Sequence, residues 1–410
     1  MRIPVVLRTV ALLVGLALWI GWGWSITTGK GAMDRTGTVV GTDFVMFYAA
    51  GQTVLRGETE RLYDQEFQKE LQQKLIGERF SGYYHLYTPP LFAVPFTMFA
   101  GTDYQTSFFI WTLLSFFCLV NALRFLQPRS LSQPLLFSLP LFPVFAGFSF
   151  GQNSNLSLLI MAATCALWIG GRDGAAGMVL SLLFYKPQLL LGVVLLWCLD
   201  WRESKRALAG LACGLAVLAL LQLLFMPQAT AAYLSLATER FADLNQSQGF
   251  PVAKQLTLAG LVSVLVPGIP GVLHHAVLLA GMFWAALLLR RFISRWGDER
   301  QWLFAAAIGA TFWLSPHAMV YDGTLLLIPA VIAATSGYVR QRDFLRIAAV
   351  GWVALLFGAR LTQIQLDLLG FAINIGALAT LCLGWWFLRL QRPLPRLRGD
   401  GREQLEEGRE

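Results

Sequence analysis

Apolar runs close to membrane-spanning length recur along this chain from its first residues almost to its end. A helix needs about 20 consecutive, mostly apolar residues to cross the hydrocarbon core of a bilayer. Runs of that kind begin near Val5, Thr106, Ala207 and Val272, and shorter ones lie between them. Since 56% of the residues are hydrophobic and only 14% are charged, we expect an all-α integral membrane protein folded as one polytopic bundle.

Basic residues near the apolar runs predict how the bundle is oriented. Arg2 and Arg8 precede the first run, residues 5–26, which resembles an uncleaved signal anchor and places the N-terminus in the cytoplasm. Residues 27–104 then form a large first extracytoplasmic loop. Later Lys and Arg residues lie mostly in short loops and in the tail, so the net charge of +8 follows the positive-inside rule and does not indicate a nucleic-acid partner.

The remaining segments predict about 10 to 12 transmembrane or half-membrane helices, with both chain ends in the cytoplasm. Within one domain of residues 1–388, further spans are expected at 106–126, 134–150, 156–169, 207–225, 272–289, 301–314, 323–337, 344–360 and 366–388. Residues 256–266 have half the spanning length, and residues 227–255 form a second outer loop. Residues 389–410 form a cytoplasmic tail that is expected to be disordered.

Two segments of the first outer loop are partly apolar and too short to span. Residues 60–80 carry Leu62, Phe67 and Leu71 at helical spacing, which predicts an amphipathic helix. This helix would lie either in the membrane interface or against the protein's own surface. Residues 88–99 are interrupted by Pro95 and fit a re-entrant or interfacial piece.

The apolar run from Gly174 to Leu199 is broken at Lys186-Pro187 and has basic residues on both flanks. This pattern predicts two half-helices with Lys186 at their apex, facing the outer side. Broken helices at membrane depth are tolerated where they line a cavity or are covered by protein. A buried ammonium needs an anion, so Lys186 is predicted to bind a phosphate.

Asp43 follows the first span in the stretch Gly41-Thr42-Asp43-Phe44 and allows two interpretations. The structural one is a helix N-cap, in which the carboxylate accepts hydrogen bonds from amides of the next turn. The functional one is a carboxylate held at the outer membrane edge as a general base.

Other polar residues fall at or near the predicted outer helix ends, and polar groups at membrane depth are costly, so together they indicate a shared cavity. Each also has a structural interpretation. Gln152 and Asn153 could only turn the chain, and His317 could be an interfacial turn residue. Asp322 could cap a helix, and Arg360 could snorkel to the interface. The residues in question are His85, Gln152, Asn153, Lys186, His317, Tyr321, Asp322 and Arg360.

The motifs missing from the sequence restrict the chemistry. It contains no Asp-x-Asp pair, Walker A, Gly-x-Ser-x-Gly or His-Glu-x-x-His pattern. The five cysteines lie in or at the ends of apolar spans, so neither a disulfide framework nor a metal cluster is expected. An energy-rich donor used on the outer face would then be a lipid-linked phosphate. One carboxylate could deprotonate an acceptor hydroxyl, and Lys or Arg could hold the donor phosphate.

The chain resembles glycosyltransferase family 87, whose members look like C-type enzymes that take sugars from polyprenyl phosphate. The resemblance rests on Gly41-Thr42-Asp43-Phe44, Tyr48-Ala49-Ala50-Gly51, Gly57, Leu62-Tyr63-Asp64, Tyr87-Thr88-Pro89-Pro90, Gly151-Gln152-Asn153, Lys186-Pro187 and Ser315-Pro316-His317. It implies that Asp43 is the catalytic base and that His317 lies near the active site. Family members often carry further His or aromatic residues after Ser-Pro-His, whereas Ala318 to Asp322 follow here, so the resemblance assigns no role to Tyr321 or Asp322.

The sequence and this resemblance together predict an inverting glycosyltransferase of the bacterial inner (plasma) membrane. It would move a sugar, with mannose expected, from polyprenyl phosphate to a lipid or glycan acceptor on the extracytoplasmic face, without a cofactor and with an open metal requirement. Asp43 would be the base, and Lys186 with Arg360 would hold the phosphate. Gln152, Asn153 and His317 would orient the substrates, with His85 and Tyr321 also in contact with them. The lipid tail would lie in a groove between helices.

Two other functions fit parts of the pattern. A transporter or flippase also uses broken helices and polar residues at membrane depth, but transporters tend to have paired halves, and the large first outer loop has no later counterpart. An assembly subunit without enzymatic activity is disfavoured because Asp, Lys and His residues converge on one predicted face.

Overall fold

The computed structural model describes residues 5–77, 80, 82–129, 131–240 and 250–391. Helices make up the architecture of these residues, and the only β contacts among them are isolated bridges, so the predicted all-α class is confirmed. Most of the predicted tail, residues 392–410, lies outside the described part.

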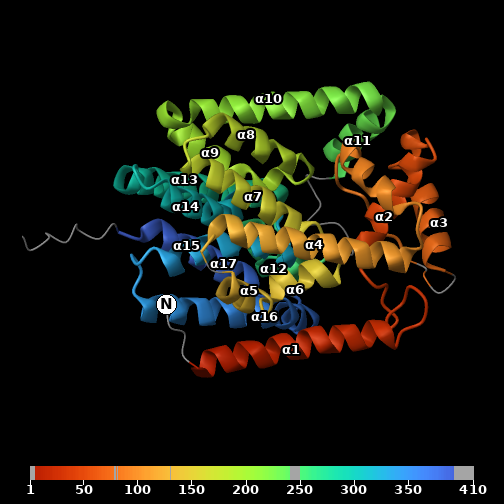
Figure 1. The fold of residues 1–410 in the computed structure, drawn as a ribbon, viewed down its shortest axis with the longest axis horizontal. Coiled ribbons are helices and arrows are strands. Elements are labelled where there is room, and N and C mark those ends of the chain that lie inside the picture. Colours follow the sequence, from red (N-terminus) through yellow and green to blue (C-terminus); the bar gives the residue numbers. More distant parts are fainter. Residues whose placement is uncertain (1–4, 78–79, 81, 130, 241–249, 392–410) are drawn as a thin grey trace, which may run out of the picture.

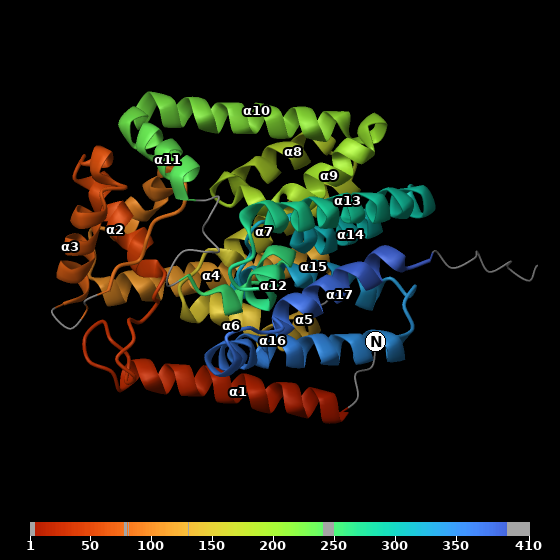
Figure 2. The same ribbon diagram turned by 180° about the vertical axis from the view of Figure 1, so that it is seen from behind.

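Among the described residues, five helices are long and apolar enough to cross a membrane. They are α1 (Val5–Thr27), α4 (Tyr104–Leu126), α10 (Trp201–Phe225), α13 (Gly271–Trp296) and α16 (Gln341–Leu369). In Figures 1 and 2, α1, α4, α10 and α13 run in similar directions along the long axis of the molecule. The chain is a multi-pass membrane protein, and its first, second and later long spans lie close to where the sequence predicts them.

The described part of the first loop gathers at one end of the bundle. There, α2 (Phe44–Leu55) and α3 (Gln65–Ile76) lie beside α11 (Pro227–Arg240), at the right of Figure 1, whereas α1 begins and α17 (Ile375–Arg389) ends at the left. A 3-10 helix, η2 (Pro90–Phe99), packs along α2 and stacks Phe96 on Phe47 with ring centroids 5.0 Å apart. The predicted short piece at 88–99 is therefore a 3-10 helix with one face packed on the protein, while Val94 and Met98 on its other face are exposed.

The predicted amphipathic helix is present but shorter, because η1 (Thr59–Arg61) precedes it and Asp64 caps α3 at Phe67. Its inner face contains two buried glutamines as well as leucine and isoleucine. Gln68 donates to Thr53 of α2 at 2.9 Å, and Gln72 donates to the carbonyl of Tyr84 at 2.8 Å. The helix therefore packs on the protein's own surface, and its charged residues are exposed.

Two sequence predictions need correction, and a third gains detail. The span expected at 134–150 is two helices, α5 (Ser132–Ser138) and α6 (Phe142–Ser149), because Pro140 and Pro143 lack a donor and restrict the residues before them. The outer loop at 227–255 contains α11 and the 3-10 helix η6 (Val252–Lys254). Spans 344–360 and 366–388 are divided later than expected, because α16 continues to Leu369 and ends at Gly370, with φ 76°.

The predicted break at Lys186-Pro187 is confirmed. It separates α8 (Asp173–Ser181) and η3 (Leu182–Tyr185) from η4 (Pro187–Leu189) and α9 (Leu191–Leu199). These pieces pack against α7 (Ser154–Ile169), α10 and α14 (Arg300–Leu314), and the chain continues through η7 (Val320–Leu326) and α15 (Leu327–Thr335). The half-length segment at 256–266 is α12 (Leu258–Leu265).

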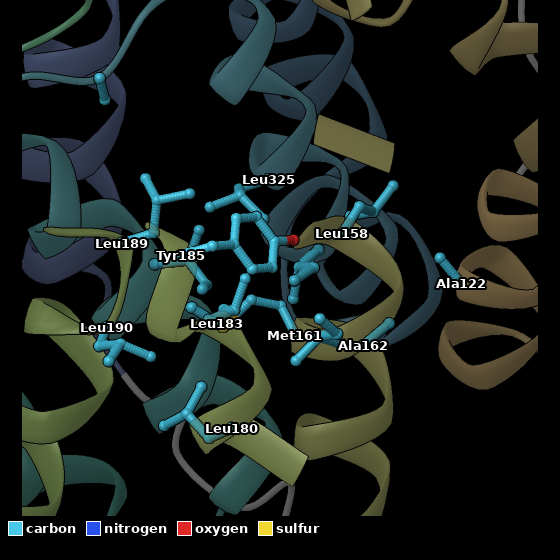
Figure 3. Close-up of a cluster of buried hydrophobic side chains, with 14 of the residues drawn as sticks. Ala122, Leu158, Met161, Ala162, Leu180, Leu183, Tyr185, Leu189, Leu190 and Leu325 are labelled. Atoms are coloured by element: carbon cyan, nitrogen blue, oxygen red, sulfur yellow. The ribbon is translucent and has the colours of Figure 1, made fainter. Parts of the chain in front are cut away.

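A buried apolar cluster anchors the broken segment (Figure 3). Side chains from η3 and η4, including Leu183, Tyr185 and Leu189, meet Leu158 and Met161 of α7. The Tyr185 hydroxyl lies 3.0 Å from the Ser157 hydroxyl, so its polar end is also paired. The non-helical backbone at Lys186 is thus covered by protein, as membrane depth requires.

Candidate active site

Asp43 occupies the N-cap position of α2, but its side chain makes no capping hydrogen bond. Its Oδ2 atom instead accepts a hydrogen bond of 2.7 Å from Nε2 of Gln152. These two residues come from loops that are far apart in sequence. The capping interpretation of the Asp43 side chain is therefore wrong, and the carboxylate is directed toward the Gly151-Gln152-Asn153 turn.

Backbone contacts hold this turn against the start of α2. The carbonyl of Phe150 accepts hydrogen bonds from the amides of Asp43 (2.8 Å) and Phe44 (3.2 Å). Gly151 has a φ of 68°, and a Cβ at this position would lie 2.6 Å from the Cβ of Phe44. Its carbonyl accepts from the indole of Trp111 at 2.9 Å. Only glycine permits this close approach without strain, so the motif glycine positions Asp43 and Gln152.

Asp43 is partly buried, and burial raises the pKa of its carboxyl group above the ordinary value. The hydrogen bond from Gln152 and the nearby positive charges of Lys254 and Lys186 oppose this rise without cancelling it. A carboxylate with a raised pKa is a better proton acceptor than an exposed one. The site therefore holds a group suited to general-base catalysis.

Lys186 and Asp322 form a buried ion pair. The Lys186 Nζ lies 2.6 Å from Oδ1 of Asp322, and the two side chains are only 9% and 2% exposed. The other carboxylate oxygen of Asp322 accepts from the amide of Met319 at 2.9 Å. The anion that the buried ammonium requires is therefore supplied by the protein itself. Through its contact with Met319, the N-cap residue of η7, Asp322 also helps to cap that 3-10 helix and not the following α15.

Two aromatic rings join the two pairs into one site. The ring of Tyr321 lies 4.7 Å from the Lys186 ammonium and packs edge-to-face on Phe150, with centroids 6.4 Å apart. Phe150 in turn carries the carbonyl that binds the Asp43 amide. A second ammonium, that of Lys254, lies 4.9 Å from the Phe150 ring. Asp43, Gln152, Lys186 and Tyr321, all predicted at the outer helix ends, are thus brought together.

His317 and Asn153 also border this site. His317 lies in the loop between α14 and η7, where burial lowers the pKa of its imidazole despite the nearby Asp322 carboxylate, so that the ring is neutral at pH 7. Asn153 is 1% exposed, and neither its amide nitrogen nor its carbonyl oxygen has a hydrogen-bond partner among the described residues. A buried amide without partners is costly, so Asn153 is suited to bind a polar ligand.

The other two predicted residues lie on further segments of the chain. His85 lies between Tyr83 and Tyr87 in the segment before η2, with ring centroids 4.3 and 5.7 Å from theirs. Arg360 is exposed on α16, a helix that packs against η6. Its guanidinium makes no ion pair with any described acidic residue. Snorkelling, the alternative predicted from the sequence, agrees with this exposure.

Sequence reasoning missed Phe150 and Lys254 and left Asp322 without a role. Phe150 is the residue before the Gly151-Gln152-Asn153 motif, and this adjacency is the signal that could have found it. Asp322 is the one acidic residue near Ser315-Pro316-His317, which made it the natural partner for a buried lysine. Lys254 has no comparable sequence signal.

One comparison with known proteins identifies the family of the chain. The model of glycosyltransferase family 87 matches residues 86–320, which is more than half of the chain and includes Gln152, Asn153, Lys186 and His317. Asp43 precedes the matched region, and Tyr321, Asp322 and Arg360 follow it. Neither the curated proteins nor the solved structures yield a match to the chain. The chain belongs to glycosyltransferase family 87 and is a membrane glycosyltransferase.

Proposed function

We propose that this protein is an inverting glycosyltransferase that moves a sugar from polyprenyl phosphate to a hydroxyl of a lipid or glycan acceptor on the extracytoplasmic face of the bacterial inner membrane. Mannose is the expected sugar. The observation that supports the proposal most strongly is the Asp43 carboxylate, which is free of the helix cap, oriented by Gln152 at 2.7 Å and raised in pKa by burial.

The proposed reaction is a single displacement. The acceptor hydroxyl gives its proton to Asp43 while its oxygen attacks the anomeric carbon of the donor. The bond from that carbon to the phosphate oxygen breaks on the opposite face, and its electron pair leaves with the polyprenyl phosphate. One base and one in-line step invert the anomeric configuration, which agrees with a site built around one unpaired carboxylate.

Asn153 and His317 are the proposed contacts for the sugar hydroxyls. The buried amide of Asn153 can donate and accept hydrogen bonds that no described residue satisfies. A neutral imidazole at His317 can likewise donate from one nitrogen and accept at the other. A site that leaves such groups unpaired without substrate discriminates well between substrates that differ by a hydroxyl group.

Lys186 contributes to the donor side of the site through its remaining hydrogen atoms. An ammonium has three donors, and Asp322 uses one of them at 2.6 Å. Asp322 fixes the direction of the ammonium and compensates its charge in a buried position. The Lys186–Asp322 pair thus offers directed hydrogen bonds to the lipid-linked sugar donor but carries little net charge.

An apolar cavity of about 340 Å³ supports the proposed binding of a lipid tail. It lies between α1, α5, α15, α16 and α17, and its lining includes Val10, Trp352 and Leu355. One side begins at Leu326 and Leu327, at the end of the 3-10 helix that carries Tyr321 and Asp322. Because α1 and α16 are candidate spans, an isoprenoid chain in this groove would also face lipid.

A reconstituted transfer assay tests the proposed function. Purified protein in lipid nanodiscs would receive polyprenyl phosphates carrying different sugars, with a crude lipid extract as the acceptor source. The proposal predicts acceptor-dependent release of polyprenyl phosphate, fastest with mannose, and no release from nucleotide sugars. Transfer from a nucleotide sugar in the absence of any lipid-linked donor would contradict it, and lipid movement without transfer would favour a flippase.

A further inference from the structure

Lys254 places an exposed positive charge beside the candidate base. It ends η6, and its ammonium lies 4.9 Å from the ring of Phe150. The Phe150 carbonyl accepts the Asp43 amide at 2.8 Å, so Lys254 and Asp43 are in contact with the same residue. The positive charge of Lys254 also acts to lower the pKa of the Asp43 carboxyl group, against the larger effect of burial.

The backbone around Lys254 is fixed by both neighbouring segments. Gln255 forms an isolated bridge with Met319, and the amide of Leu256 donates to the carbonyl of Ala318 at 2.8 Å. On the other side, the buried amide of Asn374 donates to the carbonyls of Val252 (3.3 Å) and Gln255 (3.0 Å). The base of the Lys254 side chain is therefore held in place, and only the side chain itself is free to move.

The charges of the site differ in how they are compensated. The Lys186 charge is neutralised by Asp322 at 2.6 Å within the protein. Lys254 makes no ion pair with any described carboxylate, and its ammonium packs on the ring of Phe150. A cation–π contact at an exposed site is worth only about 0.5–1 kcal/mol. The Lys254 ammonium can therefore turn to an anion at small cost.

We propose that Lys254 binds the phosphate of the lipid-linked donor. The inference rests on the proposed function and specifies which cation of the site takes the donor phosphate. As the bond from the anomeric carbon to the phosphate oxygen breaks, negative charge grows on that oxygen, and an uncompensated ammonium stabilises it more than a neutral pair does. Lys186 then directs a hydrogen bond, while Lys254 supplies the net positive charge.

The test measures donor and acceptor kinetics separately for Lys254→Gln, Lys254→Arg and a control, Lys69→Gln. Lys69 is also an exposed lysine and lies on α3, at the right of Figure 1. For Lys254→Gln we expect the donor KM to rise about 10- to 100-fold, as for the loss of a charge-assisted hydrogen bond, with the acceptor KM unchanged. Lys254→Arg and Lys69→Gln should stay within about threefold of wild type.

Three results would overturn the inference. A donor KM for Lys254→Gln within about threefold of wild type would show that Lys254 does not hold the phosphate. A rise in the acceptor KM alone would mean that Lys254 binds an anionic group of the acceptor and not the donor phosphate. A fall in kcat alone would mean that Lys254 acts only through Asp43.

A binding measurement separates this inference from the proposed function. Polyprenyl phosphate without a sugar is titrated into wild type and Lys254→Gln, and its dissociation constant is measured by thermophoresis. If wild type transfers no sugar but binds polyprenyl phosphate at least ~10-fold more tightly than the variant, the proposed reaction fails and the inference stands. Equal binding by the two proteins would overturn the inference, whatever the transfer assay shows.

Discussion

Lys186 and Asp322 are 136 residues apart in sequence, yet their side chains form a buried ion pair of 2.6 Å between the break of α8 and α9 and the 3-10 helix η7. The pair ties the broken segment to the loop that carries His317 and Tyr321. It also means that the protein itself supplies the anion for its buried ammonium.

Removing one member of this pair should destabilise the protein strongly. Lys186→Met or Asp322→Leu leaves a buried charge without its partner, which costs about 3–5 kcal/mol. The double variant Lys186→Met/Asp322→Leu should recover most of that loss, because neither charge remains. Denaturant titration in detergent measures the free energy of unfolding of the two single variants and of the double variant.

An exposed ion pair in the same protein provides the control. Arg61 and Asp64 lie 3.9 Å apart, with side chains 44% and 45% exposed, so Arg61→Ala should cost less than about 1 kcal/mol. If Asp322→Leu were as mild as Arg61→Ala, the pair would not be the structural link described above.

The hydrogen bond from Gln152 should set the acidic limb of the pH–rate profile. Asp43 acts as a base only when ionised, so kcat/KM should fall as the pH falls through the raised pKa of Asp43. Gln152→Leu removes a hydrogen bond that lowers this pKa, and the limb should move to higher pH. Gln52→Leu is the matched control, because Gln52 bonds to Tyr48 and Ala100. An unmoved limb in Gln152→Leu would remove Gln152 from the control of Asp43.

Gly151 should be needed both for stability and for the position of Asp43. Gly151→Ala introduces a strained backbone at φ 68° and a Cβ that meets Phe44, which together cost about 1–3 kcal/mol or more. Because the Phe150 carbonyl next to it binds Asp43, transfer by the folded fraction should also slow. Gly37→Ala has φ 79° but no atom within 4 Å of the added Cβ, so it should cost less and leave transfer unchanged. Equal rates in the two variants would contradict the positioning role.

The predicted orientation can be tested by cysteine labelling in intact cells. Lys69 on α3 and Arg202 at the start of α10 are both exposed and lie toward opposite ends of the bundle (Figure 1). An impermeant maleimide should label Lys69→Cys in intact cells and Arg202→Cys only after permeabilisation. The unmodified chain, with its own cysteines, serves as the blank. The reverse labelling pattern would place the loop of residues 27–104 in the cytoplasm.

Much of the bundle could be predicted from the sequence, because each long span signals itself by length and hydropathy alone. The gathering of Asp43, Gln152, Lys186 and Tyr321 followed from the same reasoning, since the alternation of spans places their helix ends on one side. The break at Lys186-Pro187 was visible because a charge and a proline interrupt an apolar run.

The partners within the site could not be predicted, because they depend on side-chain directions. A sequence pattern could not show that Asp43 would occupy the N-cap position of α2 yet turn to Gln152. Nor could it show that Asp322 would take the ammonium of Lys186, since that contact requires the 3-10 geometry of η7. The division of residues 134–150 into two helices was not predicted, because the high hydropathy of the whole run hid the effect of Pro140 and Pro143.

The variant Asp43→Asn tests the catalytic role of Asp43 without destabilising the fold. A carboxyl group whose pKa is raised on folding stabilises the protein fully at a pH below its unfolded pKa. That contribution is lost as the pH rises through its folded pKa. The ionised form of Asp43 therefore opposes folding. Asparagine is of the same size and carries no charge. The variant should therefore be at least as stable as wild type at pH 7, in contrast to the Lys186 and Asp322 variants.

The most direct test of Asp43 as the base is sugar transfer by purified Asp43→Asn in nanodiscs, at saturating polyprenyl-phosphate sugar and alongside wild type. Loss of general-base help is typically worth about 10²–10⁴ in rate. We predict a folded variant that binds polyprenyl phosphate as wild type does and transfers sugar at least ~10²-fold more slowly. Turnover within a few-fold of wild type would contradict the proposed role of Asp43.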